Sequence, residues 1–324
     1  MSAHDPLVSV VTPVYNAEKY LDECIRSVLS QTYQNWEYII VNNCSTDRTL
    51  TIAGKYAQND PRIQVYTNKH FVGVIKNHNI AFTLISPKSK YCKVVSADDW
   101  IFPHCIERLV EIGEQHPSVG VIGAYGILGD RAICFGLPLG TNLFPGREVC
   151  RLRLFGSDTL GAPTNVLYRA AFIRDLKPFF AGSAPNADQD ACFRVLQYSD
   201  YGFVHQILCF QRMHEEMLSK QLGKLNTFIL DDIEFLVKYG PVYLRPEEYK
   251  KRLKEVLNGY YRFLAVAAIN FYGRQFWHYH KNRMKEIGYR FDYLALIKAV
   301  IEKFMDLFLN PKLSIEKILK RLKK

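Results

Sequence analysis

Carboxylate and amide side chains stand directly after short apolar stretches of this chain, where a β-strand would end. Asp98 and Asp99 follow one such stretch, Asn42 and Asn43 follow another, and a second acidic group at 188–190 opens a helical pattern. Adjacent carboxylates suit Mg²⁺ or Mn²⁺, which bind one or two carboxylates together with substrate phosphates. If Asp98 and Asp99 are considered alone, the alternative is that they cap the N-terminus of a helix.

Strand and helix patterns alternate along the first 125 residues. Apolar runs of strand length occur at 7–12, 37–41, 63–66, 91–96 and 119–123. Helical patterns occupy most of the intervals, at 18–30, 74–85 and 103–115 and after 45–47. This alternation predicts βαβ units and an α/β fold with a Rossmann-like, mainly parallel sheet flanked by helices. Such sheets bind ligands at the carboxyl ends of their strands, which is where the acidic residues fall.

Charge and periodicity change near residue 220. Residues 1–220 carry 21 Lys and Arg against 21 Asp and Glu, whereas residues 221–324 carry 21 against 11. The region at 126–160 has no clear period, a helix is expected at 186–198, and helical candidates follow at 224–239, 247–272 and 292–309. We therefore expect two domains, 1–220 with the α/β fold and 221–324 as an all-helical, basic, amphipathic extension.

Composition excludes several classes of protein. An apolar fraction of 48% is ordinary for a globular protein, and no run reaches the roughly 18 apolar residues that span a bilayer. The N-terminus lacks the pattern of a signal peptide, and the eight cysteines form no CxxC pair, so we expect buried free thiols and a cytoplasmic location. The chain lacks the motifs of nucleic-acid-binding domains, and we expect no nucleic-acid partner.

Five short motifs occur in an order that resembles family 2 glycosyltransferases with the GT-A fold. The family pattern is a strand ending in TPVYN, then V-D-D/N-x-S-T-D-x-T, D-x-D-D, an E-D helix and R-x-H-x-x-x-x-S. The corresponding stretches lie at 12–16, 41–49, 96–99, 189–190 and 212–219. The resemblance implies an inverting, metal-assisted hexosyltransferase. Its donor would be a nucleotide diphosphate sugar and its acceptor a glycan or lipid-linked saccharide, in surface polysaccharide or glycoconjugate biosynthesis.

The resemblance also assigns residues to the donor. Donor or nucleotide contacts would come from Thr12, Pro13, Tyr15, Glu18, Asn43, Ser45, His78, Ala97, Asp98 and Asp99. Among these, Pro13, Tyr15 and Glu18 would line the base and ribose pocket, and Asn43 would face the base. Asp99 would support the metal ligand or touch the sugar.

The remaining roles concern the metal, the leaving group and the acceptor. Asp98 and His214 would hold Mn²⁺ or Mg²⁺. Arg212 and Ser219 would belong to a loop that closes over the diphosphate, where cationic and hydrogen-bonding groups stabilise the developing charge. Asp190 would be the general base that takes the proton of the acceptor hydroxyl. The acceptor would contact Trp100, for which plain packing is the alternative, and Gln189.

Several positions depart from the family pattern. Asn42 and Asn43 replace an acidic pair, so a uridine diphosphate sugar is expected but the base is left open. Ser96 replaces the first Asp of the metal motif, His78 stands where Arg is common, and Gln189 replaces Glu. A catalytically inactive GT-A-like nucleotide-binding protein is the alternative function. Retention of both Asp98 and Asp190 favours the enzyme.

The C-terminal region has an amphipathic pattern. One stripe of apolar residues is formed by Tyr293, Leu296, Ile297, Val300, Ile301, Phe304, Met305 and Phe308. Residues 312–324 then carry six Lys or Arg and one Glu. A basic amphipathic helix binds anionic membrane surfaces, which would place the protein at the inner face of the cytoplasmic membrane. Packing of the stripe on the catalytic domain, or on a second subunit of a homo-oligomer, is the alternative.

Overall fold

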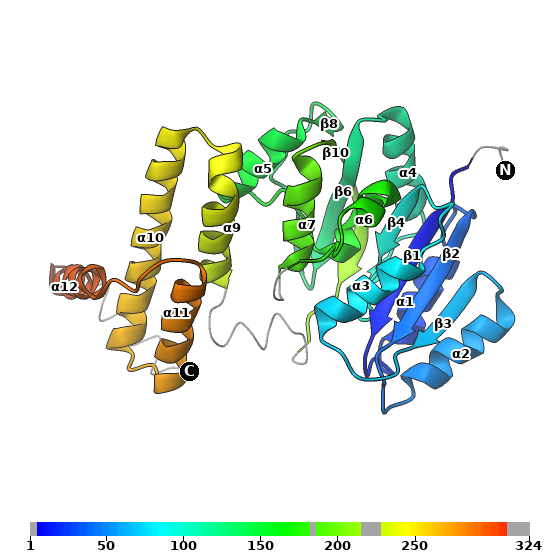
Figure 1. Cartoon of the computed structure of the whole chain (residues 1–324), viewed down its shortest axis with the longest axis horizontal. Coiled ribbons are helices and arrows are strands. Elements are labelled where there is room, and N and C mark those ends of the chain that lie inside the picture. The colour runs from blue at the N-terminus through cyan, green and yellow to red at the C-terminus, as the bar shows by residue number, and fades with distance from the viewer. Residues whose placement is uncertain (1–4, 182–185, 215–227, 310–324) are drawn as a thin grey trace. The chain divides into compact units, whose positions relative to one another are not determined.

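The computed structural model describes residues 5–181, 186–214 and 228–309. The chain divides into two compact units, Met1–Met217 and Leu218–Lys324. Figure 1 shows that the first unit is mixed α/β and that the second is helical. Ser219 and the basic stretch at 312–324 lie outside the described residues, so their predicted roles stay predictions.

One ten-stranded sheet forms the centre of the first unit. Its strand order is β3-β2-β1-β4-β9-β6-β10-β5, with β7 paired to β6 and β8 paired to β10. The strands are β1 (Val8–Val14), β2 (Trp36–Asn42), β3 (Ile63–Thr67), β4 (Tyr91–Val94), β5 (Trp100–Ile101), β6 (Val119–Leu128), β7 (Arg131–Ile133), β8 (Leu143–Phe144), β9 (Val166–Arg169) and β10 (Asp200–Gln211).

The pairing confirms the α/β fold and adds five strands, β5, β7, β8, β9 and β10, to the five that the sequence pattern predicts. β3, β2, β1 and β4 are parallel neighbours, as the βαβ spacing predicts. The four-residue strand β9 is antiparallel to both β4 and β6, so the sheet is mixed. β4 and β6 each run antiparallel to β9 and therefore parallel to each other, and β10 is parallel to β6. These three strands end at one edge of the sheet.

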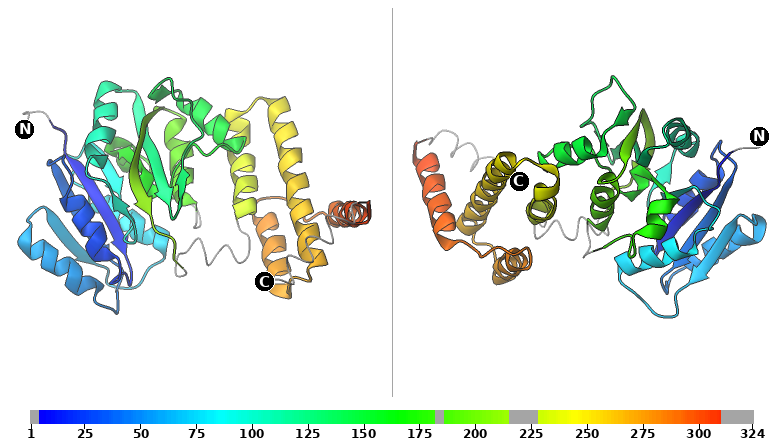
Figure 2. Two further views of the ribbon diagram at one scale, coloured as in Figure 1. Left: turned by 180° about the vertical axis from the view of Figure 1, so that it is seen from behind. Right: turned by 45° about the horizontal axis from the view of Figure 1, so that its top comes forward.

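Helices cover both faces of this sheet (Figures 1 and 2). They are α1 (Leu21–Leu29), α2 (Thr49–Asn59), α3 (Val74–Leu84), α4 (Cys105–Gln115), α5 (Gly146–Leu154), α6 (Ala170–Asp175) and α7 (Ala187–Leu196), with a 3₁₀ turn η1 (Pro163–Asn165). The apolar faces of α1 and α4 share one core cluster with the sheet. That cluster includes Val8 and Val10, whereas Val11, the next residue along β1, is not part of it and belongs to the opposite face, as strand alternation requires.

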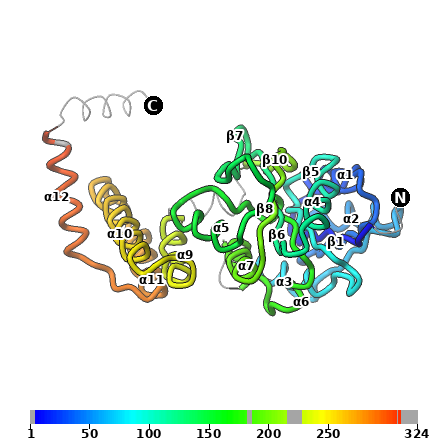
Figure 3. Tube along the Cα trace, turned by 90° about the horizontal axis from the view of Figure 1, so that it is seen from above, coloured from blue at the N-terminus to red at the C-terminus, as the bar shows by residue number. Residues whose placement is uncertain are grey.

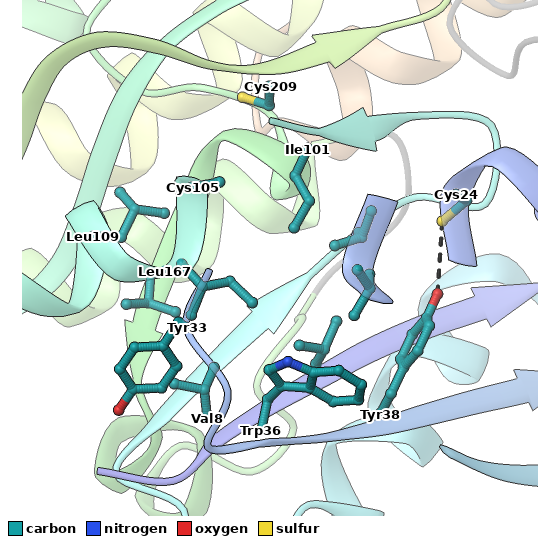
Figure 4. Close-up of a cluster of buried hydrophobic side chains, with 14 of the residues drawn as sticks. Val8, Cys24, Tyr33, Trp36, Tyr38, Ile101, Cys105, Leu109, Leu167 and Cys209 are labelled. Atoms are coloured by element: carbon teal, nitrogen blue, oxygen red, sulfur yellow. Dashed lines mark hydrogen bonds between the residues drawn. The ribbon is translucent and has the colours of Figure 1, made fainter. Parts of the chain in front are cut away.

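The cysteines contribute to the core as neutral thiols. All eight are free, and seven are buried. In Figure 4 the Cys24 sulfur lies against the Tyr38 hydroxyl, at 3.6 Å, within the cluster that also contains Trp36 and Leu109. Burial raises the pKa of the Cys24 thiol to about 12, which keeps it protonated at neutral pH. The prediction of buried free thiols is therefore confirmed.

The second unit consists of helices with their own core. They are α9 (Phe228–Tyr243), α10 (Pro246–Ile269), α11 (Arg274–Glu286) and α12 (Tyr293–Leu309), and Figure 3 traces them along the chain. The sequence pattern predicts α9, α10 and α12 but misses α11. Its buried positions are Phe276, His280 and Met284, spaced four apart, and a histidine breaks the apolar signal. Among the described residues, none of the helices has the length and apolar character needed to cross a bilayer.

Candidate active site

Two loops at the carboxyl ends of β1 and β2 are tied to each other by hydrogen bonds. The Glu18 amide donates to the Asp47 carboxylate at 3.0 Å, and the Arg48 amide donates to the Glu18 carboxylate at 3.0 Å. The Asn16 amide donates to Ser45 Oγ at 3.0 Å. Asn16 has φ of 47°, a left-handed conformation that Asn tolerates. In this structure the side chains of Glu18 and Ser45 therefore hold the loop pair together, which differs from the predicted donor contacts.

The end of β1 divides the predicted pocket residues into buried and open positions. Thr12 is fully buried, and its hydroxyl donates to the Val95 carbonyl at 2.8 Å and lies 2.9 Å from Tyr38 Oη. Its side chain supports the strand end, which corrects the prediction that it contacts the donor. Tyr15 is 48% exposed and stands edge-on to Phe71, with ring centroids 4.9 Å apart. Tyr15 and the half-buried Pro13 remain open to a ligand.

Three hydrogen bonds within the chain engage the amide of Asn43, which is only 3% exposed, and these contacts differ from the predicted contact with a nucleotide base. Its Oδ1 accepts from the Val72 amide at 3.0 Å and from Asn68 Nδ2 at 3.0 Å, while its Nδ2 donates to the Val72 carbonyl at 2.8 Å. Two bonds to one backbone residue fix the orientation of the amide. Asn43 therefore clamps the segment around residue 72 onto the end of β2.

His78 lies on α3 and is half-buried. Its Nδ1 is 2.9 Å from the Val74 carbonyl, and its ring lies 5.4 Å from that of Phe180. Burial lowers the pKa of His78 below its usual value, and the bond to Val74 offsets only part of this effect. The side chain is therefore neutral at pH 7, and it does not supply the positive charge of the Arg that is common at this position in the family pattern.

Asp99 points inward from the end of β4 and is only 6% exposed. Its carboxylate accepts from the Thr164 hydroxyl at 2.6 Å and from the Arg212 amide at 3.1 Å. Burial, followed by the nearby charge of Asp98, raises the pKa of Asp99 to about 7. Asp99 thus joins η1 and the end of β10 to the β4 loop.

Asp98 and His214 meet although they lie 116 positions apart. Asp98 Oδ2 and His214 Nε2 are 3.0 Å apart, and the two side chains are 31% and 17% exposed. A carboxylate oxygen and an imidazole nitrogen at this separation can ligate one divalent cation from the same side. Within the described ranges, no group of three or more His, Cys, Asp or Glu side chains could hold a metal. Asp98 and His214 would need water or phosphate oxygens to complete the coordination of a cation. The neighbouring Ala97 is buried.

Arg212 packs onto this loop instead of extending away from it. Its Nε donates to the Asp98 carbonyl at 3.2 Å, and its guanidinium pairs with Glu23. The guanidinium also lies 4.9 Å from the centroid of the Trp100 ring, which stacks on Phe210 at 3.9 Å. Phe210 and Arg212 both pack on the Trp100 ring, so packing describes Trp100 better than the predicted contact with an acceptor.

Asp190 occupies the first turn of α7, where the helix dipole favours a negative charge. Arg194, one turn further on, donates from Nε to Asp190 Oδ2 at 3.1 Å and orients the carboxylate. Gln189 accepts from Arg153 Nε at 3.0 Å. Burial raises the pKa of the neighbouring Asp188 to about 6. Asp98, Asp99, Arg212 and His214 thus form one bonded group, whereas Asp190 and Gln189 bond to residues of α5 and α7.

Comparison with known proteins adds a family match. Residues 9–176 match the model of "Glycosyl transferase family 2". A Haemophilus influenzae protein described as an uncharacterized glycosyltransferase is 40% identical over 226 residues, which is 67% of this chain and 66% of that protein. The chain spans about two thirds or less of the length of the curated relatives it matches.

Solved structures share the fold at low identity. S. aureus TarS 1–349 in complex with UDP-GlcNAc superposes with a TM-score of 0.63 at 19% identity, over 87% of this chain and 80% of that one. Mannosyltransferase PcManGT from Pyrobaculum calidifontis, in complex with GDP-Man and Mn²⁺, gives a TM-score of 0.53 at 14% identity, over 94% and 88%. These likenesses concern the fold alone.

Proposed function

Because the chain belongs to glycosyl transferase family 2, we propose that it transfers a hexose, with inversion, from a nucleotide diphosphate donor to a hydroxyl of a glycan or lipid-linked saccharide in surface polysaccharide or glycoconjugate biosynthesis. The observation that carries this proposal is the Asp98–His214 pair, 3.0 Å apart at the end of β4. A screen of nucleotide sugars for release of the nucleoside diphosphate tests it. Release from none of the donors, with acceptor present, would favour the alternative of an inactive nucleotide-binding protein.

Asp98 and His214 are the residues that would hold Mn²⁺ or Mg²⁺. A cation bound there stabilises the charge that develops on the departing diphosphate. The PcManGT complex with GDP-Man and Mn²⁺ supports this choice of cofactor. Arg212 keeps the loop that carries Asp98 in place. Its Nε donates to the Asp98 carbonyl, and its backbone amide donates to the Asp99 carboxylate.

Asp190 is the residue that we assign to proton removal. The acceptor oxygen attacks the anomeric carbon while the bond from that carbon to the diphosphate oxygen breaks, and the hydroxyl proton passes to an Asp190 carboxylate oxygen. A single displacement with one base inverts the anomeric centre. The bond from Arg194 fixes the direction of the carboxylate, which proton transfer in the transition state requires.

The donor base is expected to be uracil, and calorimetry with UDP, GDP and dTDP should show UDP binding about tenfold more tightly, a difference of ~1.4 kcal/mol. Because Asn43 is engaged with Val72, the base must be recognised elsewhere, and the exposed Tyr15 ring is the candidate. Tyr15→Ala should weaken UDP binding by about 1–3 kcal/mol, the range for loss of a base–aromatic stack.

Tyr66→Ala is the matched control, because Tyr66 is an exposed tyrosine of β3 that bonds Gln64. It should leave UDP binding unchanged. Tighter binding of GDP or dTDP than of UDP would overturn the base assignment. S. aureus TarS was solved with UDP-GlcNAc and PcManGT with GDP-Man, so the fold accommodates both bases.

The apolar stripe of α12 divides into a packed and an exposed part. Leu296 and Val300 pack with Ala299 on the core of the second unit. A second group of side chains, which we call the α12 face, is more than half exposed and consists of Leu294, Ile297, Ile301, Phe304, Met305 and Phe308. We assign this face to an anionic membrane surface, because the 221–324 region carries 21 Lys and Arg against 11 Asp and Glu. The protein would then lie at the inner face of the cytoplasmic membrane, next to a lipid-linked acceptor.

Vesicle co-sedimentation should show that the full chain binds vesicles containing phosphatidylglycerol, binds phosphatidylcholine vesicles poorly, and dissociates in high salt. Phe304→Ser with Phe308→Ser should lower binding at least about tenfold, since each substitution removes ~2 kcal/mol of apolar burial. A chain ending at Pro311 should also bind less.

Tyr198→Ser is the control for this experiment, because Tyr198 is an equally exposed aromatic residue of the first unit. It should bind vesicles as the unchanged chain does. If the double serine variant binds vesicles normally, the α12 face is not the membrane contact. If that variant instead converts an oligomer into a monomer, the face belongs to a homo-oligomer interface.

A further inference from the structure

Lys93 is a lysine with 0% exposure in the middle of the sheet. It lies on β4, five residues before Asp98. Its Nζ donates to the backbone carbonyls of Thr164, of Val166 at 3.2 Å and of Val94 at 3.4 Å. An ammonium in the protein interior is unfavourable unless its donors are satisfied, and these carbonyls satisfy all three. A leucine or valine would be the ordinary choice for this position, so the charge requires an explanation.

One hydrogen-bond partner of Lys93, Thr164, also bonds to the loop of the proposed donor site. Thr164 is also fully buried, and its hydroxyl donates to Asp99 Oδ2 at 2.6 Å. The same hydroxyl accepts from the Ser96 amide at 3.2 Å. The carbonyl of Thr164 is thus held by Lys93, while its side chain holds both ends of the loop at 96–99. A shift of η1 away from Lys93 would therefore move this loop, and Asp98 with it.

We propose that Lys93 is a positioning residue of the donor site, which acts through Thr164 to fix the loop that carries Asp98 and Asp99. This inference rests on the proposed function only in that the loop is taken to bind the cation and the diphosphate. Lys93 touches neither ligand itself. η1 is a 3₁₀ turn that precedes β9, and the Lys93 ammonium bonds the carbonyl of Thr164 within that turn.

The test compares Lys93→Met and Thr164→Val with the unchanged chain by calorimetry of UDP binding in the presence of Mn²⁺. Each variant should bind UDP–Mn²⁺ at least tenfold more weakly. The double variant should bind no more weakly than the worse single variant, because both substitutions interrupt one chain of contacts. Leu109→Ala, a core substitution on α4, should lower the thermal midpoint and leave the affinity unchanged.

Amide hydrogen exchange is the second readout and requires no ligand. In Lys93→Met the amides of 96–99 and 164–165 should exchange at least tenfold faster, while those of β2 and β3 keep their rates. Normal UDP–Mn²⁺ affinity in folded Lys93→Met, or effects of the two substitutions that add fully, would overturn the inference. If Lys93→Met does not fold, calorimetry and hydrogen exchange on Thr164→Val alone test the inference. If the unchanged chain binds no nucleotide, the proposed function fails, and exchange still decides the role of Lys93.

Discussion

Asp190→Asn is expected to lower kcat by about 10²–10⁴-fold, the usual contribution of a general base, while the affinity for the donor nucleotide changes by less than about twofold. The amide keeps the shape of the carboxylate and can still accept from Arg194, so the first turn of α7 should remain in place. It cannot take the proton of the attacking hydroxyl. Steady-state kinetics with both substrates, together with calorimetry of UDP, separates the loss of turnover from a loss of binding.

Asp188→Asn provides the matched control for this substitution. Asp188 lies two residues earlier in the same helical turn and is buried, and Asn keeps the size and shape of its side chain while removing the carboxylate. We expect kcat within about threefold of the unchanged enzyme, since this carboxyl is not assigned to the proton transfer. If Asp190→Asn retains a tenth or more of the original kcat, another group is the base.

Asp98→Asn is expected to lower kcat/KM by at least about 10²-fold, because stabilisation of a leaving group by a cation contributes several kcal/mol and 1.36 kcal/mol corresponds to a factor of ten. The amide oxygen is a weak ligand without charge, and His214 alone would hold the cation poorly. Excess EDTA should abolish activity, and added Mn²⁺ or Mg²⁺ should restore it. Restoration in the Asp98→Asn enzyme should require a much higher metal concentration.

A surface carboxylate gives the control for the metal experiment. Asp60 forms an ion pair with Arg62 near the start of β3, and Asp60→Asn should leave the metal dependence unchanged. The thermal midpoint of Asp98→Asn should stay close to that of the unchanged enzyme, because Asp98 is partly exposed. Full activity in excess EDTA would contradict a metal-assisted reaction and would leave Asp98 with a role in binding the sugar.

Five of the strands, and the strand ends that carry acidic residues, could be predicted from the sequence. Apolar runs alternating with helical patterns identify β1 to β4 and β6, and parallel strands necessarily present their carboxyl ends at one edge. The family resemblance also assigned Asp98 and His214 to one metal site. The distance of 3.0 Å between them could not be predicted, because it depends on the position of β10 in the sheet.

Hydrogen-bond partners could not be predicted from residue types. Glu18 and Asn43 have side chains suited to a nucleotide, yet both bond to neighbouring loops. A polar side chain near a strand end can serve a ligand or a loop with the same atoms, and only the path of the adjacent loop decides between them. Lys93 left a usable signal, because a lysine inside an apolar strand must be buried and must therefore have polar partners.

The bonds that join residues 16–18 to residues 45–48 determine how this part of the molecule could be re-engineered. Each loop supplies a backbone donor and a side-chain acceptor to the other, as Glu18 and Asp47 illustrate. A loop from a relative with another donor preference, grafted at only one of the two positions, would lose the bonds that depend on the side chains of the other loop and leave the resident loop without those of the replaced one. The two loops form a single module for exchange, and chimaeras should transfer both together.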